Sequence, residues 1–409
     1  MLPRAFEKAA ERQLSKRGDT HMMTRLFHRL LTFAGAALVA ASAAAGASAA
    51  EPIKIGSFLT VSGPASFLGD PEKKTLELYV ERINAAGGVL GRPLQLTVYD
   101  TGGDAKQAAT FARRLIEEDK VDFLIGGSST GDTMAAVPII ERAEIPFISL
   151  GGASVIVDPV KKWVFKTPHT DRLAVEKVYA DMKKRGLSKL GLIAGDGGFD
   201  KSCVANASDK MLLDRYGVSV VGNEAYSTGD KDTTAQLTKL KAAPGIQAIL
   251  FCGFGVASVI VTKNYHQLGI SVPLYHSHGS ASKQFITGAG EAAEGARLPA
   301  AAVIVAGQLP DSDPQKKVGL AYTKAYEDRY HEAISTFGGH AYDALMLLVD
   351  AIKRAGTIDR AKVRDALEST KNYIGVDGIY NITPTDHDGL NVSSFKMVEV
   401  KNGNWNYLY

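Results

Sequence analysis

Apolar and polar positions alternate regularly along most of this chain. Four apolar runs have the length and composition of buried or half-buried β-strands: IKIGSF (53–58), LQLTVYD (94–100), VDFLIGG (121–127) and IPFISLGG (145–152). Between the second and third runs, apolar residues recur at the spacing of one helix face: Ala108, Phe111, Ala112, Leu115 and Ile116. This part of the chain therefore predicts alternating strands and helices.

The same rhythm starts again after residue 188. The new strand-like runs are KLGLIAGD (189–196), GVSVVGNEAY (217–226), IQAILFCGFG (246–255) and VPLYHSH (272–278). Helices are expected between them, near residues 201–215, 232–242 and 256–268. A βαβα series that occurs twice predicts two doubly wound parallel sheets, each at the centre of an α/β lobe. The last quarter is mainly helical, and residues 378–409 have the pattern of terminal strands and turns.

The first fifty residues have the pattern of a processing segment. Arg25 and Arg29 precede an uncharged, alanine-rich run, and Ala47-Ser48-Ala49 gives the small-x-small pattern of a cleavage site. We expect residues 1–49 to be a leader and signal peptide, the mature chain to start near Ala50, and the protein to be periplasmic. A retained membrane anchor is the alternative, but the run is only weakly hydrophobic.

Charge and cysteine content narrow the possible classes. The first fifty residues hold seven Lys or Arg and three acidic residues, which leaves 40 basic against 41 acidic residues in the rest. A nearly neutral mature chain gives no sign of nucleic-acid binding. Cys203 and Cys252 are the only cysteines. One disulfide is allowed in an oxidising compartment, and two buried free thiols are the equal alternative.

Six loops follow the expected strands, and their composition suits an anionic ligand. They are VSGPASFLGD (61–70), GGSSTGDT (126–133), LGGASVIVD (150–158), GDGGFDKS (195–202), CGFGVAS (252–258) and HSHGSAS (276–282). Ligands bind open α/β sheets beyond the carboxyl ends of the strands. Gly, Ser and Thr with several aromatic residues and almost no cations suit a carboxylate held by hydroxyl and N–H groups. For any one loop the simpler interpretation is turn chemistry, and Phe199 and Phe254 can equally be core residues.

Cofactor and metal motifs are weak or absent in the sequence. No G-x-x-x-x-G-K-[ST] pattern occurs, and G-x-G-x-x-G is missing after the first strand, so we expect no nucleotide cofactor. His276 and His278 form an H-x-H pair without an assigned third ligand, which is weak evidence for a metal site.

One alternative function is hydrolysis. The segment 127–131 (Gly-Ser-Ser-Thr-Gly) fits the G-x-S-x-G elbow of a serine hydrolase, with Ser129 as nucleophile. A triad would need His278 or His387 as base and an orienting acid, Asp343 or Asp386. Two restarts of the strand–helix pattern argue against it, because an α/β-hydrolase has one sheet.

Over nearly its whole mature length, the chain resembles the periplasmic solute-binding proteins of the leucine/isoleucine/valine-binding type, the capture components of ABC importers. The resemblance is carried by the order and spacing of five segments: GSFLTVSGPASFLGD (56–70), INAAGGVLGRPLQLTVYDTGGDAKQA (83–108), FLIGGSST (123–130), IPFISLGGAS (145–154) and STGDKDTTAQLTKLK (227–241). It implies a non-enzymatic, monomeric protein that binds a small molecule and meets a membrane permease. A sensing domain of the same fold, which signals to a membrane partner, is a further alternative.

The resemblance also implies two lobes joined by three chain crossings that close on the ligand. We expect these crossings near Phe165–Asp171, Val303–Gly307 and Gly375–Tyr380. The first lobe would then contain residues 50–170 and 307–376, and the second lobe residues 171–306 and 377–409.

Family residues can be carried over to matching positions. The ligand carboxylate would be held by Ser129 and Thr130 and by Gly152, Ala153 and Ser154, with Phe67 and Leu68 from the first loop nearby. Family members that bind amino acids use two aromatic residues and an acid on the second lobe, and these positions fall on Phe199, Phe254 and His278.

The histidine is a departure from the family pattern. An imidazole cannot replace a carboxylate opposite an ammonium group. His278 therefore indicates an acid without an amino group, such as an aromatic acid or aromatic 2-oxo acid, rather than an α-amino acid. A branched-chain or other amino acid is the alternative ligand.

Overall fold

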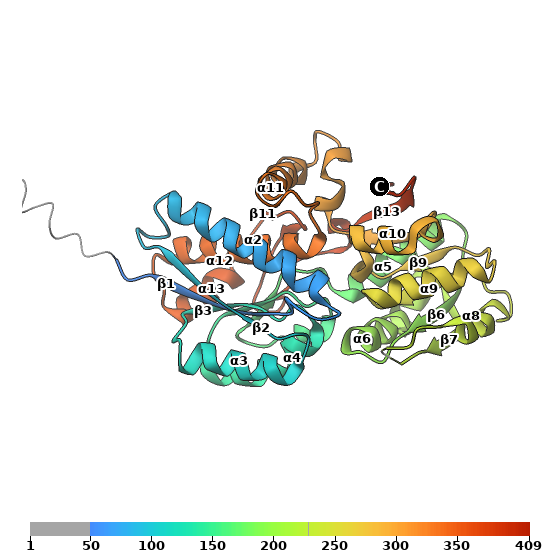
Figure 1. Ribbon diagram of the computed structural model, residues 1–409, viewed down its shortest axis with the longest axis horizontal. Helices are drawn as coiled ribbons and strands as arrows, with labels where there is room; N and C mark the ends of the chain where they lie inside the picture. The colour runs from blue at the N-terminus through green and yellow to red at the C-terminus, as the bar shows by residue number, and fades with distance from the viewer. Residues whose placement is uncertain (1–49, 228) are drawn as a thin grey trace, which may run out of the picture. The chain divides into compact units, whose positions relative to one another are not determined.

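The computed structural model of this protein describes residues 50–227 and 229–409 (Figure 1). The expected leader and signal peptide, residues 1–49, fall outside this part of the chain. None of the helices in the described residues is long and apolar enough to cross a membrane.

The first sheet is fully parallel, with the strand order β2-β1-β3-β4-β5. Its strands are β1 (Ile53–Leu59), β2 (Leu94–Asp100), β3 (Phe123–Gly126), β4 (Phe147–Ser149) and β5 (Val164–Lys166). Neighbouring side chains point to opposite faces, as the pleat requires: Ile55 and Phe123 enter one apolar cluster, whereas Phe58 and Leu124 enter another.

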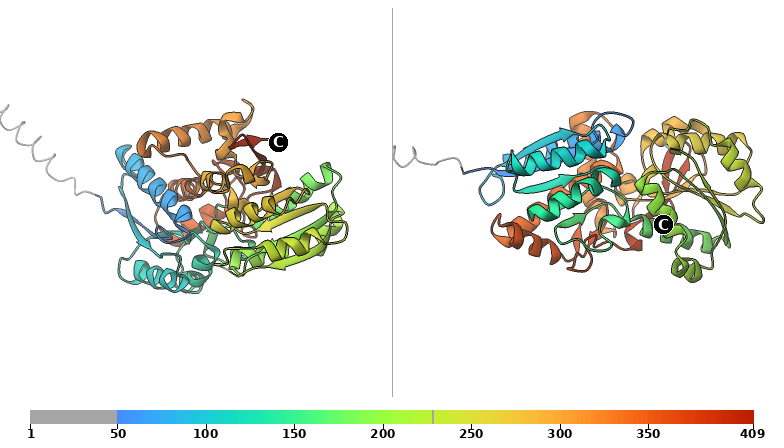
Figure 2. Two further views of the ribbon diagram at one scale, coloured as in Figure 1. Left: turned by 45° about the vertical axis from the view of Figure 1, so that its right-hand side comes forward. Right: turned by 90° about the horizontal axis from the view of Figure 1, so that it is seen from below.

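Helices cover both faces of this first sheet (Figures 1 and 2). One face packs against α2 (Ser66–Ala85), α12 (Thr336–Ala355) and α13 (Arg360–Glu368), and the other against α3 (Ala105–Glu117) and α4 (Thr130–Ala143). We call this sheet and the elements packed on it the first lobe. Part of this lobe comes from late in the chain, since α12 contributes Leu345 and Leu348 to its core.

The second sheet has the strand order β14-β13-β10-β9-β8-β6-β7. Its strands are β6 (Lys189–Ala194), β7 (Ser219–Ala225), β8 (Ala248–Cys252), β9 (Leu274–His276), β10 (Arg297–Ala300), β13 (Lys396–Lys401) and β14 (Asn404–Tyr407). The first five are parallel to one another, and β13 and β14 extend the sheet in antiparallel fashion. The expected doubly wound parallel sheet is thus present, and two antiparallel strands extend one of its edges. We call this sheet and its helices the second lobe.

Helices also cover both faces of the second sheet (Figure 2). On one face lie α5 (Asp171–Lys184), α6 (Gly198–Ala207) and α7 (Lys210–Tyr216), and on the other α8 (Thr234–Lys241) and α9 (Val256–Gln267). The single helix expected near 201–215 is therefore two helices. Asp209 caps α7 by accepting a hydrogen bond from the backbone N–H of Leu212.

A link between the two layers of the second lobe answers the question of the cysteines. Cys203 in α6 and Cys252 at the end of β8 form a disulfide, with their Cα atoms 5.6 Å apart. The alternative of two buried free thiols is therefore wrong.

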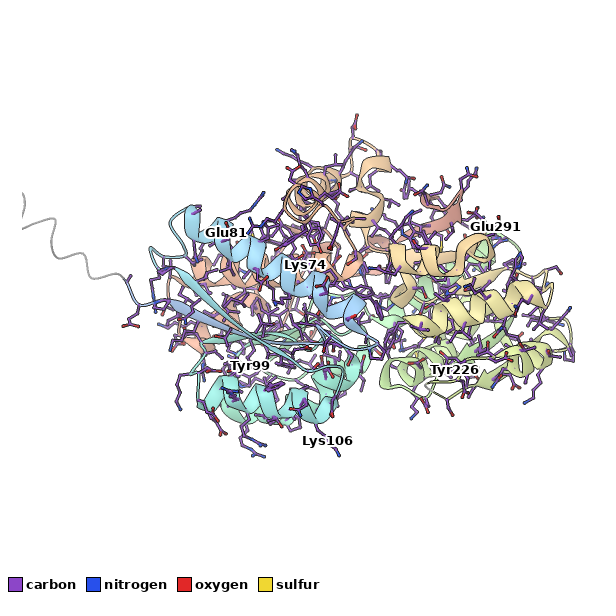
Figure 3. All side chains as sticks on the ribbon, viewed as in Figure 1. Lys74, Glu81, Tyr99, Lys106, Tyr226 and Glu291 are labelled. Atoms are coloured by element: carbon purple, nitrogen blue, oxygen red, sulfur yellow. A yellow bond between two sulfur atoms is a disulfide. The ribbon has the colours of Figure 1, made fainter. Side chains whose placement is uncertain are left out.

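Three further elements come from the last third of the chain. They are α10 (Lys283–Ala289), α11 (Pro314–Tyr330) and the hairpin of β11 (Tyr373–Ile374) and β12 (Ile379–Tyr380). Lys74 of α2, labelled in Figure 3, pairs with Glu332 just after α11, at an Nζ–Oε2 distance of 2.7 Å. This ion pair joins α11 to the first lobe.

The chain passes between the lobes three times. The first passage is Thr167–Thr170, between β5 and α5, and lies within the expected Phe165–Asp171. The second is the 3-10 segment Ala302–Gln308, in which Val303 packs against Tyr322 while Val305 packs against the second lobe.

The expected position of the third passage is wrong. Tyr380, Ile382 and Leu390 all belong to the apolar core of the first lobe, so the chain remains there well beyond Gly375–Tyr380. It joins the second sheet only at Lys396, the first residue of β13. The reason is that β12 buries Tyr380 under α12, and hydrophobic pattern alone does not tell which of two cores receives a strand.

Candidate functional site

A cavity lies where loops of both lobes meet. Its lining comes from the carboxyl ends of β3 and β4 in the first lobe, of β6, β8 and β9 in the second, and from the start of α12. The lining residues are Leu68, Ser128, Ser129, Thr130, Leu150, Gly152, Pro168, Phe199, Phe254, His278, Gly279, Phe337 and His340. No acidic side chain and no lysine or arginine is among them.

The first wall is the start of α4. Ser129 caps this helix, and its hydroxyl accepts a hydrogen bond from the backbone N–H of Asp132 over 3.1 Å. Thr130, the first helical residue, is buried, and its hydroxyl has no hydrogen-bond partner. The unbonded N–H groups of a first helical turn attract an anion. Ser129 and Thr130 thus lie where a carboxylate could be held.

Ser128 was not predicted, and its hydroxyl is already engaged. It donates to Oε2 of Glu72 over 2.5 Å and accepts from the backbone N–H of Thr60 over 3.0 Å. Burial raises the pKa of the Glu72 carboxyl well above its ordinary value, which favours the neutral form. Ser128 therefore separates a buried acid from the cavity.

The loop after β4 contributes one predicted residue to the cavity and withholds two. A Cβ on Gly152 would lie 2.9 Å from Nε2 of His278, so only glycine fits between the lobes here. Ala153 is buried, and it does not line the cavity. The hydroxyl of Ser154 accepts a hydrogen bond from Nδ2 of Asn206 over 3.0 Å. Ala153 and Ser154 therefore lie outside the lining of this cavity, because their loop turns toward α6.

Aromatic rings form the second-lobe wall. The centroids of Phe199 and Phe254 lie 5.7 Å apart in an edge-to-face arrangement, and Phe199 meets His278 in the same way at 5.3 Å. Both phenylalanines line the cavity, as the resemblance implied. Phe67 does not line it but packs behind, with its ring 5.6 Å from that of Phe337 and 6.3 Å from that of Phe254.

His278 faces the cavity as a neutral imidazole. Its two ring nitrogens are buried, and neither has a hydrogen-bond partner. Burial, together with the charge of Lys166 and the nearby His340, lowers its pKa well below the ordinary value. A buried ring with two unpartnered nitrogens is costly unless a ligand engages it. This favours a role in binding over a structural one.

The start of α12 supplies two cavity residues that the sequence did not reveal. Phe337 and His340 stand one helical turn apart and point to the same side, with ring centroids 5.9 Å apart. Nδ1 of His340 lies 2.5 Å from Oδ2 of Asp377. The sequence carried no distinct signal for either residue, because α12 also contains Asp343, Asp350, Lys353 and Arg354 among its apolar residues.

A buried lysine lies beneath the cavity. The ammonium of Lys166, the last residue of β5, donates to the carbonyl of Gly152 over 3.2 Å. Burial lowers its pKa, while Asp388 and Asp171 act in the opposite direction. Burial also raises the pKa of Asp388 to about 7.

The arrangement required for hydrolysis is not present among the described residues. His387 stacks on Phe165 at 4.1 Å, and its Nδ1 donates to the carbonyl of Val164. Asp343 accepts hydrogen bonds from the backbone of residues 376 and 377. No histidine is bonded to Ser129 in this part of the chain, and the serine serves as a helix cap.

The H-x-H pair also separates. His276 bonds through its two nitrogens to Thr262 and Ser280, each over 3.1 Å, and does not line the cavity that His278 faces. Within residues 50–227 and 229–409, no group of three potential metal ligands occurs.

Comparison with known proteins identifies the family of this chain. The family model described as periplasmic binding protein matches residues 52–404. A leucine-, isoleucine-, valine-, threonine- and alanine-binding protein of Pseudomonas aeruginosa is 29% identical over 353 residues, covering 86% of this chain and 89% of that protein. A Leu/Ile/Val-binding protein homologue of Brucella melitensis is 27% identical over 324 residues, covering 78% and 84%.

Solved structures agree. An extracellular ligand-binding receptor from Rhodopseudomonas palustris HaA2 superposes with a TM-score of 0.81 at 31% identity, covering 88% of this chain and 100% of that one. The LivJ substrate-binding protein of Streptococcus pneumoniae, solved with isoleucine, gives a TM-score of 0.75 at 24% identity over 87% of this chain and 98% of that one, which bears on the fold alone. The chain therefore belongs to the periplasmic binding protein family, and within it to the type I proteins of the leucine/isoleucine/valine-binding kind.

Proposed function

We propose that this protein is the extracytoplasmic solute-binding component of an ABC importer. In this proposal it captures a small carboxylate, an aromatic acid or aromatic 2-oxo acid, between its closing lobes, and the closed form meets a membrane permease. It acts as a monomer in the periplasm after removal of the leader, and it has no enzymatic activity. The fold and the family of the chain support the general role.

One observation carries the choice of ligand: the cavity combines an anion-binding helix start with walls that bear no charge. The α4 N-terminus and the unpartnered hydroxyl of Thr130 suit a carboxylate. An α-ammonium group would enter a closed cavity with no carboxylate to meet it, which costs several kcal/mol. His278 stands where relatives that bind amino acids are expected to have an acid.

The names of the relatives support the second candidate. The Pseudomonas aeruginosa protein is named for leucine, isoleucine, valine, threonine and alanine. In this chain the carboxyl of Glu72 does not line the cavity, but it accepts a hydrogen bond from Ser128, which does. An amino-acid ligand would require that the buried Glu72 become ionised.

A thermal-shift screen tests the proposal. Residues 50–409 are unfolded and refolded to remove carried-over ligand, and then tested with aromatic acids, aromatic 2-oxo acids, their amides and branched-chain amino acids. A ligand at 100 times its Kd stabilises by about 2.7 kcal/mol, which gives a shift of a few degrees. Stabilisation by the acids but not by the amides is expected. Stabilisation by leucine or valine alone would refute the aromatic-acid ligand.

Two variants locate the site. Thr130→Val removes a hydroxyl that has no partner in the protein, so we expect unchanged stability and about tenfold weaker carboxylate binding. Ser154→Ala is the matched control, since that hydroxyl faces Asn206 and not the cavity. Equal affinities for the two variants would show that the carboxylate does not bind at α4.

A further inference from the structure

His340 is a cavity residue for which the carboxylate-binding role leaves no task. It lies in the second turn of α12, in the first lobe, and faces the same cavity as His278 of the second lobe. The two imidazoles are close enough to influence each other electrostatically. No charged side chain lines this cavity, although the buried Lys166 acts electrostatically on both rings.

The His340 ring is held in one orientation. Its Nδ1 lies 2.5 Å from Oδ2 of the fully buried Asp377. Its backbone carbonyl accepts a hydrogen bond from the hydroxyl of Thr167, over 2.9 Å, in the first passage between the lobes. The backbone N–H groups of Val376 and Asp377 donate to Asp343, which is on the same helix as His340. The ring therefore has little freedom to turn.

The contact with Asp377 also fixes which nitrogen carries the hydrogen. Burial raises the pKa of Asp377 well above its ordinary value, and burial with the charge of Lys166 lowers that of His340 to about 3, so both groups are neutral. Oδ1 of Asp377 is buried and has no partner. A proton on Oδ1 would be an unsatisfied donor, so the proton belongs on Oδ2, which donates to Nδ1. Nε2 of His340 then carries the ring hydrogen as a donor.

We propose that His340 is a specificity-determining residue that donates a hydrogen bond from Nε2 to a neutral oxygen of the ligand, separate from its carboxylate, with Asp377 as the positioning residue. This inference rests on the proposed function. The ligand is then a carboxylic acid that also bears a keto or hydroxyl oxygen. An acid without that oxygen leaves a desolvated N–H unpaired in the closed cavity, and such a group costs more than a lost hydrogen bond.

Titration calorimetry with matched acids tests this. The probes are pairs that differ by one oxygen function: 3-phenylpropanoate and phenylpyruvate, phenylacetate and mandelate, benzoate and 4-hydroxybenzoate. In the wild-type protein, the oxygenated member of at least one pair should bind about tenfold more tightly. His340→Asn places an amide at the position of Nδ1 and nothing at Nε2, so this ratio should fall toward one.

Two further variants separate recognition from folding. His340→Gln places its amide near the position of Nε2 and should retain most of the preference. Asp377→Asn can still donate to Nδ1 and should retain it too, whereas Asp377→Leu should lower it. A purely structural role would weaken both members of a pair equally, which the ratio does not register. His276→Asn, which removes a buried histidine outside the cavity, is the matched control.

The outcomes distinguish this inference from the proposed function. A preference that persists in His340→Asn, or no preference in the wild-type protein, overturns the role of His340 while carboxylate binding stands. If neither member of any pair binds, the proposed function fails as well. A preference that is lost in His340→Asn and kept in His340→Gln supports the inference.

Discussion

The disulfide between Cys203 and Cys252 allows a quantitative test of what stabilises the second lobe. It closes a loop of 49 residues in sequence separation. The loss of chain entropy in the unfolded state for a loop of this length amounts to about 4 kcal/mol. Both cysteines are almost completely buried, so replacement by alanine adds a small packing cost. We expect the Cys203→Ala/Cys252→Ala variant to lose about 4 kcal/mol of unfolding free energy.

The assay can report on one lobe at a time, because each lobe contains one of the two tryptophans. Trp163 belongs to the core of the first lobe, whereas Trp405 of β14 packs against Phe285 in the second. In a Trp163→Phe background, fluorescence during guanidinium unfolding therefore follows the second lobe. The comparison is between this background with and without the two cysteine substitutions.

Two results would refute the reasoning. Equal unfolding free energies would mean that the cross-link does not restrict the unfolded chain as calculated. Alkylation of both cysteines in the unfolded wild-type protein, without reductant, would show by mass that the disulfide is absent. We expect the mass to be unchanged.

Two other predictions use single residues. Burial lowers the pKa of His276 to about 3, so the unfolded state binds a proton below about pH 6.5 that the folded state refuses; stability is lost as pH falls. Between pH 7.5 and 4.5 this residue lowers the free energy of unfolding by about 2.7 kcal/mol. The free energy of unfolding of His276→Asn, measured in urea, should therefore depend less on pH than that of the wild type. Parallel pH profiles of the two proteins would contradict this prediction. Gly152→Ala should weaken ligand binding at least tenfold with an unchanged unfolding midpoint, because its Cβ would lie 2.9 Å from His278 and 3.0 Å from Phe199. An unaltered affinity, measured by calorimetry, would show that the lobes close differently.

Helices and strands with a clear spacing of hydrophobic residues, or with a continuous apolar run, could be predicted from the sequence. The runs that became β1, β3, β6 and β8 are apolar on both faces, as buried parallel strands are. The short strands β5 and β10 have three and four residues, too few to show a period. Which core receives β12 depends on the position of α12, and that is tertiary information.

The site divides in the same way. Ser129, Thr130, Gly152, Phe199 and His278 follow strands, where the topology of an open sheet brings loops together. Phe337 and His340 come from the start of α12, which does not follow a strand of either sheet. Only the packing of α12 places them in the cavity.

The late position of α12 has a consequence for the order of folding. Residues 171–300 provide β6 to β10 and the helices around them as one continuous stretch, whereas one face of the first sheet waits for residues 336–368. A chain that emerges N-terminus first therefore completes the parallel part of its second sheet while the first still exposes apolar strands. The first-lobe strands are the segment that a chaperone would need to shield, and substitutions at the core positions of α12, such as Leu345 and Leu348, should act on the yield of folded protein before they act on ligand affinity.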